Sequence, residues 1–237
     1  MRKPFVIGHR GCPTRAPENT LEGIREAFKA GVDLVEIDVR ACKDGLVVIH
    51  DPELSRLAGK NLLVRECNLD DLRRVRVRGA KIPTLSEALE LIKELGIGVV
   101  LDVKDEGIEE DLMDELKSYN LVDRVYIISF KHDIIRRVKE YEPRVRAGII
   151  MVSKPIKLIE VIKVAKADAV FMPGFLWGVE TLSKEVVNEV HRGGFEIVGD
   201  PVNDKHTLKR ALELGLDGIG TDRAYEIVKT LRDIGLR

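Results

Sequence analysis

Residues 34–39, Leu-Val-Glu-Ile-Asp-Val, form a short and nearly apolar run with acidic residues at two alternate positions. A run of this kind is typical of a strand buried on both faces of a parallel sheet. It follows residues 21–30, which have helical periodicity and end at Gly31, a residue type that often terminates helices. The sequence therefore predicts a helix followed by a buried strand at this point.

The same alternation recurs along the chain. Segments of helical periodicity include residues 21–30, 85–95, 108–119, 134–141, 184–192 and 205–214. Eight apolar runs predict strands at residues 5–8, 34–39, 99–103, 125–129, 147–151, 169–172, 196–198 and 218–221. Eight alternations in 237 residues favour an α/β (β/α)8 TIM barrel, a fold of about 250 residues. An open doubly wound sheet is the alternative, but residues 8–13, Gly-His-Arg-Gly-Cys-Pro, lack the glycine pattern of a dinucleotide-binding turn.

One connection is longer than the others. After the second predicted strand come a Lys43-Asp44-Gly45 turn, an apolar run at residues 46–50 and a polar segment that ends at Ala80. We interpret residues 51–80 as a small insertion over the mouth of the barrel. Because no linker separates this insertion, we expect a single domain over residues 1–237.

Composition excludes several classes of protein. The net charge is −1, whereas nucleic-acid-binding proteins usually carry a basic face. The three cysteines form no disulfide framework, and we find neither a signal peptide nor a run long enough to enter a membrane stably. We therefore expect a cytoplasmic protein. Charged residues make up 33% and glutamine is absent, a pattern that favours a thermophilic source.

Polar side chains end the first predicted strands, where TIM barrels carry their functional groups. Glu36 and Asp38 are two residues apart, so their side chains point to the same face of the strand. With Asp102 of the third strand they would offer three oxygen ligands, a set that favours Mg²⁺ or Ca²⁺. The alternative is a buried ion network in which Arg40 or Lys104 neutralises the two carboxylates.

Two histidines also follow apolar runs. His9 and His50 stand beside charged residues, and two imidazoles near neutral pH can serve as base and acid. Arg10 and Lys104 offer fixed positive charge suited to a phosphate. Asn19, three residues before Glu22, fits the N-cap of the helix at residues 21–30.

Taken together, these residues resemble the glycerophosphodiester phosphodiesterase family. The matching motifs are His9-Arg10-Gly11, Pro17-Glu18-Asn19-Thr20, Glu36-x-Asp38, His50-Asp51, Ile82-Pro83-Thr84-Leu85, Ser129-Phe130, Val202-Asn203 and Gly218-Ile219-Gly220-Thr221-Asp222. They occur in the family's order and extend from Ile7 to about Tyr225. The resemblance implies a (β/α)8 barrel with a small insertion after strand two, one divalent metal ion (Mg²⁺ or Ca²⁺, with Mn²⁺ as a further option), and a small-molecule glycerophosphodiester substrate of lipid and glycerol metabolism.

The resemblance also implies roles for individual residues. They are an acid–base pair of His9 and His50, phosphate contacts from Arg10 and Lys104, metal ligands Glu36, Asp38 and Asp102, and supporting residues Glu18, Asn19, Asp51 and Asn203. Two positions depart from the family pattern. Asp102-Val103-Lys104 stands where Glu-x-Lys is usual, and Asp200-Pro201 stands before Val202-Asn203 where a tryptophan is usual. Trp177 is the only tryptophan and follows the sixth predicted strand.

The expected reaction gives a glycerol phosphate and an alcohol. We assign His9 as the base and His50 as the acid. The nucleophile is either water or the neighbouring glycerol hydroxyl, which would form a cyclic phosphate first. Two alternatives are a phospholipase-type enzyme acting on intact or lyso-lipids, which would need an apolar rim, and a non-catalytic phosphate-binding barrel, which would need no acid–base pair.

Overall fold

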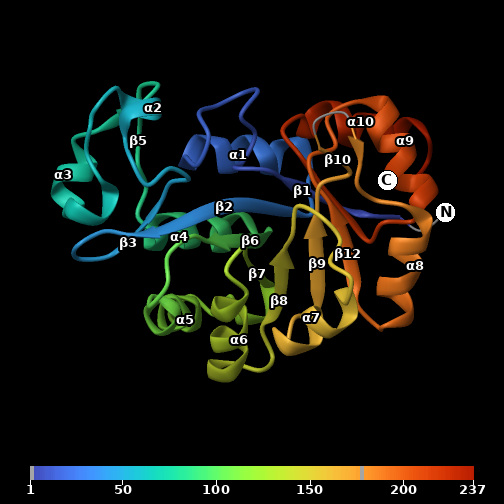
Figure 1. The fold of residues 1–237 in the computed structure, drawn as a ribbon. Coiled ribbons are helices and arrows are strands. Elements are labelled where there is room, and N and C mark those ends of the chain that lie inside the picture. The colour runs from blue at the N-terminus through green and yellow to red at the C-terminus, as the bar shows by residue number, and fades with distance from the viewer. Residues whose placement is uncertain (1–2, 177–178) are drawn as a thin grey trace.

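Eight parallel strands close into a barrel in the computed structural model, which describes residues 3–176 and 179–237 (Figure 1). The hydrogen-bonded order around the barrel is β1-β13-β12-β9-β8-β7-β6-β2, and β2 pairs with β1 to close it. Their bounds are β1 Phe5–Gly8, β2 Leu34–Ala41, β6 Gly98–Val103, β7 Val125–Ser129, β8 Arg146–Ile150, β9 Ala169–Met172, β12 Glu196–Gly199 and β13 Gly218–Thr221. The predicted (β/α)8 barrel is confirmed, and all eight predicted strands are present.

Helices surround the barrel and connect its strands (Figure 1). Their bounds are α1 Leu21–Ala30, α4 Leu85–Leu95, α5 Glu109–Ser118, α6 His132–Tyr141, α7 Leu158–Val164, α8 Lys184–Arg192, α9 Lys205–Leu214 and α10 Ala224–Asp233. Thr20, Thr84, Ser183 and Asp204 cap α1, α4, α8 and α9 with side-chain oxygens that accept backbone N–H groups. No helix in the described part of the chain is long and apolar enough to cross a membrane.

The barrel interior changes character along its axis. Below the mouth, toward the N-terminal ends of the strands, the interior is filled by buried apolar side chains: Ile7, Val100, Tyr126, Ile128, Ala169, Phe171 and Val198. Because side chains alternate along a strand, the residue two positions after an interior residue also points inward. On three strands that next interior residue is acidic: Leu34 is followed by Glu36 and Asp38, Val100 by Asp102, and Val198 by Asp200. On these three strands, apolar packing therefore ends where the carboxylates begin, whereas on β7 it continues with Ile128 in register with Asp102.

The second strand is two residues longer than predicted and runs out of the barrel toward the segment that contains α2 and α3 (Figure 1). Its last residues pair antiparallel with β3 Leu46–Val48, and His50 follows directly. Residues 47–82 enclose a small apolar core of their own, which includes Val47, Leu54 and Leu72. This segment contains α2 Ser55–Ala58, the 3-10 helix η1 Val64–Glu66, α3 Leu69–Arg73, and the hairpin of β4 Arg76–Val77 and β5 Ala80–Lys81. The hairpin of β2 and β3 thus carries His50 back to the barrel mouth.

Three aspartates bind strand ends at the opposite, N-terminal end of the barrel. Asp33, Asp168 and Asp217 each precede a strand, and each accepts the backbone N–H of a neighbouring strand at 2.7–2.9 Å. The acceptor for Ile197 N–H is Asp217 Oδ2, which also contacts His191 Nε2 at 2.8 Å. These carboxylates satisfy buried strand donors far from the mouth, so their expected contribution is to stability.

We predict that Asp217→Ala lowers the free energy of unfolding by about 1–3 kcal/mol, because the buried N–H of Ile197 loses its acceptor. Asp217→Asn keeps an acceptor oxygen and should cost less. Urea denaturation measures both changes, and kcat of the folded fraction should stay at the wild-type value. Wild-type stability of Asp217→Ala would contradict this account of the strand ends.

Candidate active site

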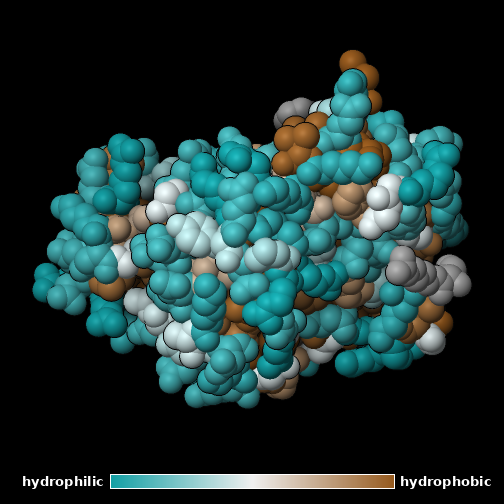
Figure 2. Space-filling view, turned by 90° about the horizontal axis from the view of Figure 1, so that it is seen from below, coloured by the Kyte–Doolittle hydropathy of each residue, from teal (hydrophilic) through white to brown (hydrophobic). Residues whose placement is uncertain are grey.

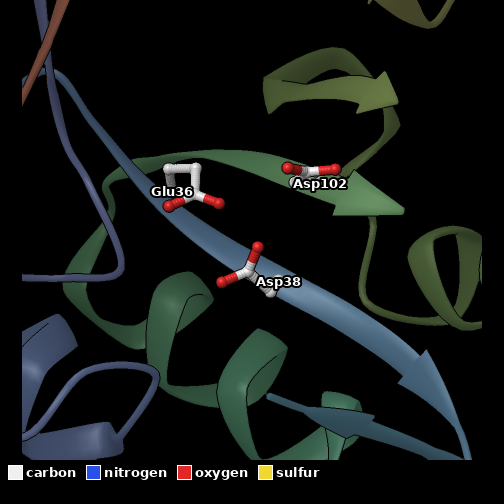
Figure 3. A group of neighbouring side chains, drawn as sticks. All are labelled: Glu36, Asp38 and Asp102. Atoms are coloured by element: carbon white, nitrogen blue, oxygen red, sulfur yellow. The ribbon is translucent and has the colours of Figure 1, made fainter. Parts of the chain in front are cut away.

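Three buried carboxylates meet at the mouth of the barrel. Glu36 and Asp38 point inward from β2, and Asp102 faces them from β6, where it pairs in register with Asp38 (Figure 3). One ligand oxygen from each lies within 4.8 Å of the other two. The predicted convergence of these side chains follows directly from the register of the two parallel strands.

The charge on this cluster is only partly neutralised by the protein. Burial, together with the neighbouring Asp38, raises the pKa of Glu36 to about 8. Burial also raises the pKa of Asp102 to about 6, although Lys104 opposes the shift. Asp102 Oδ1 is buried and has no hydrogen-bond partner. Hard oxygen ligands that converge with an unfilled acceptor fit a divalent cation.

Lys104 and Arg10 approach the same carboxylates. Lys104 Nζ lies 2.8 Å from Asp38 Oδ1 and also contacts Asp102 Oδ2. These charges outweigh the effect of burial and hold the pKa of Asp38 below its usual value. Part of the predicted ion network is therefore present, but Arg40 takes no part in it, because its guanidinium binds Asp105 at 2.6 Å.

The loop after β1 wraps Arg10 around the cluster. The backbone N–H of Arg10 donates to Glu36 Oε2 at 2.6 Å, and its guanidinium lies 3.4 Å from Asp38 and 2.9 Å from Glu18. The loop turns tightly at Gly11, whose φ is 90° and whose Cα faces the backbone of Gly23 so closely that a Cβ would lie 2.6 Å from it. Only glycine fits this approach.

Asn19 does not cap α1, so that prediction was wrong. The N-cap is Thr20, which accepts from Gly23 N–H, while Asn19 adopts a φ of 57° and turns toward Asp38. Asn19 Nδ2 donates to Asp38 Oδ2 at 2.6 Å, and Asn19 Oδ1 accepts from Asp38 N–H at 3.0 Å. Two hydrogen bonds to Asp38, one to its carboxylate and one from its backbone N–H, thus take the place of the expected helix cap and hold this residue of the candidate metal centre.

His9 lies among negative charges. Its Nδ1 is 2.8 Å from Asp222 Oδ1, and Asn203 in turn donates to Asp222 Oδ2 at 2.7 Å. Burial would lower the pKa of His9, but the negative charges of Asp200, Asp222 and Glu36 outweigh it and raise the pKa to about 10. The ring is thus held through Nδ1 and protonated at neutral pH, with Nε2 left for a ligand.

His50 lies in the opposite electrostatic environment. Burial lowers its pKa below the usual value for histidine, and Arg10 and Lys104 act in the same direction against Asp38 and Asp51. Its Nδ1 is 2.7 Å from Asp51 Oδ1. His50 is therefore neutral at pH 7, and its ring is oriented by Asp51.

Arg56 connects the two halves of the site. From α2 in the inserted segment, its guanidinium contacts Asp51 at 2.5 and 3.1 Å and Glu18 at 2.8 and 3.2 Å. Asp51 orients His50, and Glu18 binds Arg10. Arg56 therefore holds two carboxylates in place: Asp51, which orients His50, and Glu18, which binds Arg10.

The two histidines, Arg10, Lys104 and the three carboxylates line one cavity of ≈ 310 Å³ at the barrel mouth. One side holds the charged groups, and the other is apolar, with Ile128, Phe130, Ile150, Met151, Val152, Phe171, Met172 and Pro173. Phe130 and Val152 are 55% and 51% exposed, and Ile156, beyond Val152 on the same loop, is 99% exposed. Figure 2 shows a largely hydrophilic face with one hydrophobic cluster that projects at its upper edge. The cavity thus joins an ionic wall to an apolar wall that reaches solvent.

Three residues at the site were given no role by the sequence. Asp222 and Asp200 could have been found from periodicity, since each closely follows an apolar strand. Arg56 carries no such signal, because it is one arginine in a polar insertion that contains several. Trp177, noted as the only tryptophan, lies outside the described residues.

Comparison with known proteins agrees with this geometry. Residues 9–226 match the Glycerophosphoryl diester phosphodiesterase family. The chain is 31% identical to a glycerophosphodiester phosphodiesterase of Caldanaerobacter subterraneus, over 98% of this chain and 100% of that protein. It is 29% identical to one of Bacillus altitudinis, over 94% and 96% of the two chains.

Solved structures show the same fold. A phosphodiesterase of Oleispira antarctica, determined in complex with its product sn-glycerol-3-phosphate, superposes with a TM-score of 0.88 at 26% identity, over 97% of each chain. The glycerophosphodiester phosphodiesterase of Thermotoga maritima superposes with a TM-score of 0.82 at 24% identity, over 97% of this chain and 99% of that one. The chain described here belongs to the glycerophosphodiester phosphodiesterase family.

Proposed function

We propose that this enzyme hydrolyses glycerophosphodiesters to a glycerol phosphate and an alcohol with one divalent cation held by Glu36, Asp38 and Asp102. The observation that carries the proposal is the convergence of three incompletely neutralised carboxylates between two histidines of opposite charge state. The all-oxygen donor set favours Mg²⁺ or Ca²⁺, with Mn²⁺ also compatible. When bound, the cation would offset negative charge that develops on the phosphate in the transition state.

The protein's own groups bind and orient the substrate. Arg10 and Lys104 line the cavity beside the carboxylates and supply positive charge to the phosphate oxygens. Asn19 and Glu18 hold Asp38 and Arg10 in place. The shorter Asp102, in place of the family's usual glutamate, is the ligand that contributes least to cation binding, because its side chain is one methylene group shorter than that of glutamate.

The electrostatics favour the reverse of the histidine roles assigned from sequence. His9, protonated and held by Asp222, donates a proton to the leaving alkoxide. His50, neutral and held by Asp51, accepts the proton of the nucleophile. The two side chains enter the cavity from β1 and from the hairpin of β2 and β3, so each can serve a different oxygen of the same phosphate.

A second candidate substrate class is a lyso-lipid. The inserted segment is polar, but the loops after β7 and β8 supply the apolar rim that this alternative requires, with Phe130, Val152 and Ile156. The acyl chain on the glycerol of such a substrate could lie along the apolar wall of the cavity. This candidate shares every catalytic step with the first.

The proposed site requires both a glycerophosphodiester substrate and a divalent metal ion for turnover. Purified enzyme should hydrolyse glycerophosphoethanolamine, glycerophosphoglycerol or glycerophosphocholine, and EDTA should abolish turnover until Mg²⁺, Ca²⁺ or Mn²⁺ is restored. A lysophosphatidylcholine with kcat/KM similar to these would favour the lyso-lipid candidate. Turnover of none of these diesters by metal-loaded enzyme would rule the proposal out.

Metal binding can also be measured independently of catalysis, through the thermal stability of the protein. A cation at 100 times its Kd should stabilise the fold by about 2.7 kcal/mol. Glu36→Gln and Asp38→Asn should remove most of this thermal stabilisation, while Asp102→Asn should remove less. Equal stabilisation of wild type and all three variants would place the cation elsewhere.

The histidine roles predict the pH dependence of kcat/KM. Activity requires neutral His50, so it should fall as pH drops through a pKa below about 6.5. Activity requires protonated His9, so it should also fall as pH rises through the pKa of His9, which Asp200 and Asp222 hold above the usual histidine value. Asp222→Asn should move the alkaline limb to lower pH, because loss of the carboxylate charge lowers the pKa of His9. An alkaline limb that does not move in this variant would refute the assignment of His9 as the acid.

Arg56 should matter for kcat although it lies outside the cavity lining. Arg56→Gln leaves Asp51 and Glu18 without their shared cation and should lower kcat about 10–100-fold, as loss of an orienting partner typically does. Arg56→Lys should rescue only part, since one ammonium cannot reproduce the two-sided contact of a guanidinium. Arg65→Gln, at an exposed position in the same segment, is the matched control. If Arg56→Gln loses thermal stability but keeps kcat, the arginine has a purely structural role.

A further inference from the structure

Asp200 is an acidic side chain of the cavity to which the proposed mechanism gives no contact with the substrate. It follows β12, two residues after the interior residue Val198, and it lines the same cavity as His9. Asp200 Oδ1 is buried and has no hydrogen-bond partner. The residue as a whole is only partly buried and borders the cavity, so a ligand that supplies a hydrogen-bond donor there would gain a charge-assisted contact with its carboxylate.

The neighbouring strand leaves room for this carboxylate. Gly220 on β13 faces Asp200 so closely that a Cβ there would lie 2.5 Å from Asp200 Oδ1. The nearby cavity residues Phe171, Met172 and Pro173 offer no side-chain donor. Asp200 Oδ1 is thus packed against the glycine of β13, and the carboxylate borders the cavity beside these apolar side chains, with His9 as its nearest electrostatic partner.

The position of Asp200 relative to His9 indicates what it faces. Around the barrel, β12 and β13 lie on one side of β1, and β2 and β6 lie on the other. Asp200 therefore lies across His9 from the three carboxylates of the candidate metal centre. His9 is paired with Asp222 through Nδ1 rather than with Asp200. A phosphate held at the metal centre would direct the ester substituent served by His9 toward Asp200.

We propose that Asp200 is a specificity-determining residue that accepts a hydrogen bond from a hydroxyl or ammonium group on the ester substituent beside His9. Such a donor would be one carbon beyond the carbon that bears the ester oxygen, as in glycerol or ethanolamine. A trimethylammonium group, as in choline, has no donor and would leave the carboxylate unpaired. This inference rests on the proposed function, because it needs a phosphodiester seated at the metal centre.

Matched phosphate monoesters test the recognition separately from the chemistry. The probes are 2-hydroxyethyl phosphate with a hydroxyl, O-phosphoethanolamine with an ammonium group, and n-propyl phosphate with neither. Inhibition constants are measured at pH 7 with the metal-loaded enzyme and with Asp200→Ala and Asp200→Asn. Using ratios between ligands cancels any general effect of the lost charge on phosphate binding.

The wild type should bind at least one donor ligand about 10–100-fold more tightly than n-propyl phosphate, the range expected for a hydrogen bond to a charged group. Asp200→Ala should reduce that ratio to within about threefold while still binding n-propyl phosphate, which reports an intact site. Asp200→Asn should retain part of a preference for hydroxyls but lose a preference for the ammonium group. The preferred ligand tells which of the two donors Asp200 accepts.

Two results would overturn the inference. One is a wild-type enzyme that binds all three monoesters alike, and the other is a donor preference that persists in both Asp200 variants. Failure of the proposed function has a different signature, because that enzyme would turn over no glycerophosphodiester at all. The isosteric Asp200→Asn variant keeps the test valid if Asp200→Ala does not fold.

Discussion

The concentration of buried negative charge at one end of the barrel interior is the constraint on which the site depends. Apolar side chains fill the interior up to the level of Val100 and Val198, and the next inward positions are carboxylates. Parallel register brings Asp38 opposite Asp102, so these charges cannot separate without breaking the barrel. Lys104 and Arg10 neutralise only part of the charge, and the proposed cation would neutralise the rest. The positions of Lys104 and Arg10 and the candidate metal centre follow from this one arrangement.

The same charge distribution distinguishes two chemically identical side chains. His9 is surrounded by carboxylates from β2, β12 and β13, and His50 stands nearer to the two cations. These surroundings favour a proton on His9 and disfavour one on His50, as the proposed acid and base would require. The inserted segment contributes through Arg56, whose contacts reach the supports of both His50 and Arg10. An element that looks peripheral in the fold thus supports the centre of the site.

The sequence predicted the strands and helices, which depend on local periodicity, and the grouping of residues at strand ends, which depends on chain order. It missed features in which a side chain can bind either of two competing partners. Strands and helices could be found because apolar runs and helical periods are local, and Glu36, Asp38 and Asp102 could be grouped because strand ends meet at one edge. Asn19 was assigned to a helix cap because its local context fits one, but a distant carboxylate competes for its amide. The charge of His9 could not be obtained either, since it depends on Asp222 and Asp200, more than 190 residues from His9 in the chain. The oxygens that remain unpaired are visible only in three dimensions.

The central claim is that the three carboxylates of β2 and β6 hold one divalent cation between the two histidines. Anomalous diffraction from crystals soaked in Mn²⁺ tests it most directly. The account predicts a single strong peak among the oxygens of Glu36, Asp38 and Asp102, with Glu36 and Asp38 at about 2.0–2.6 Å and Asp102 at that distance or bridged by water. A peak at another site, or Lys104 still occupying the space between Asp38 and Asp102 at saturating Mn²⁺, would contradict it.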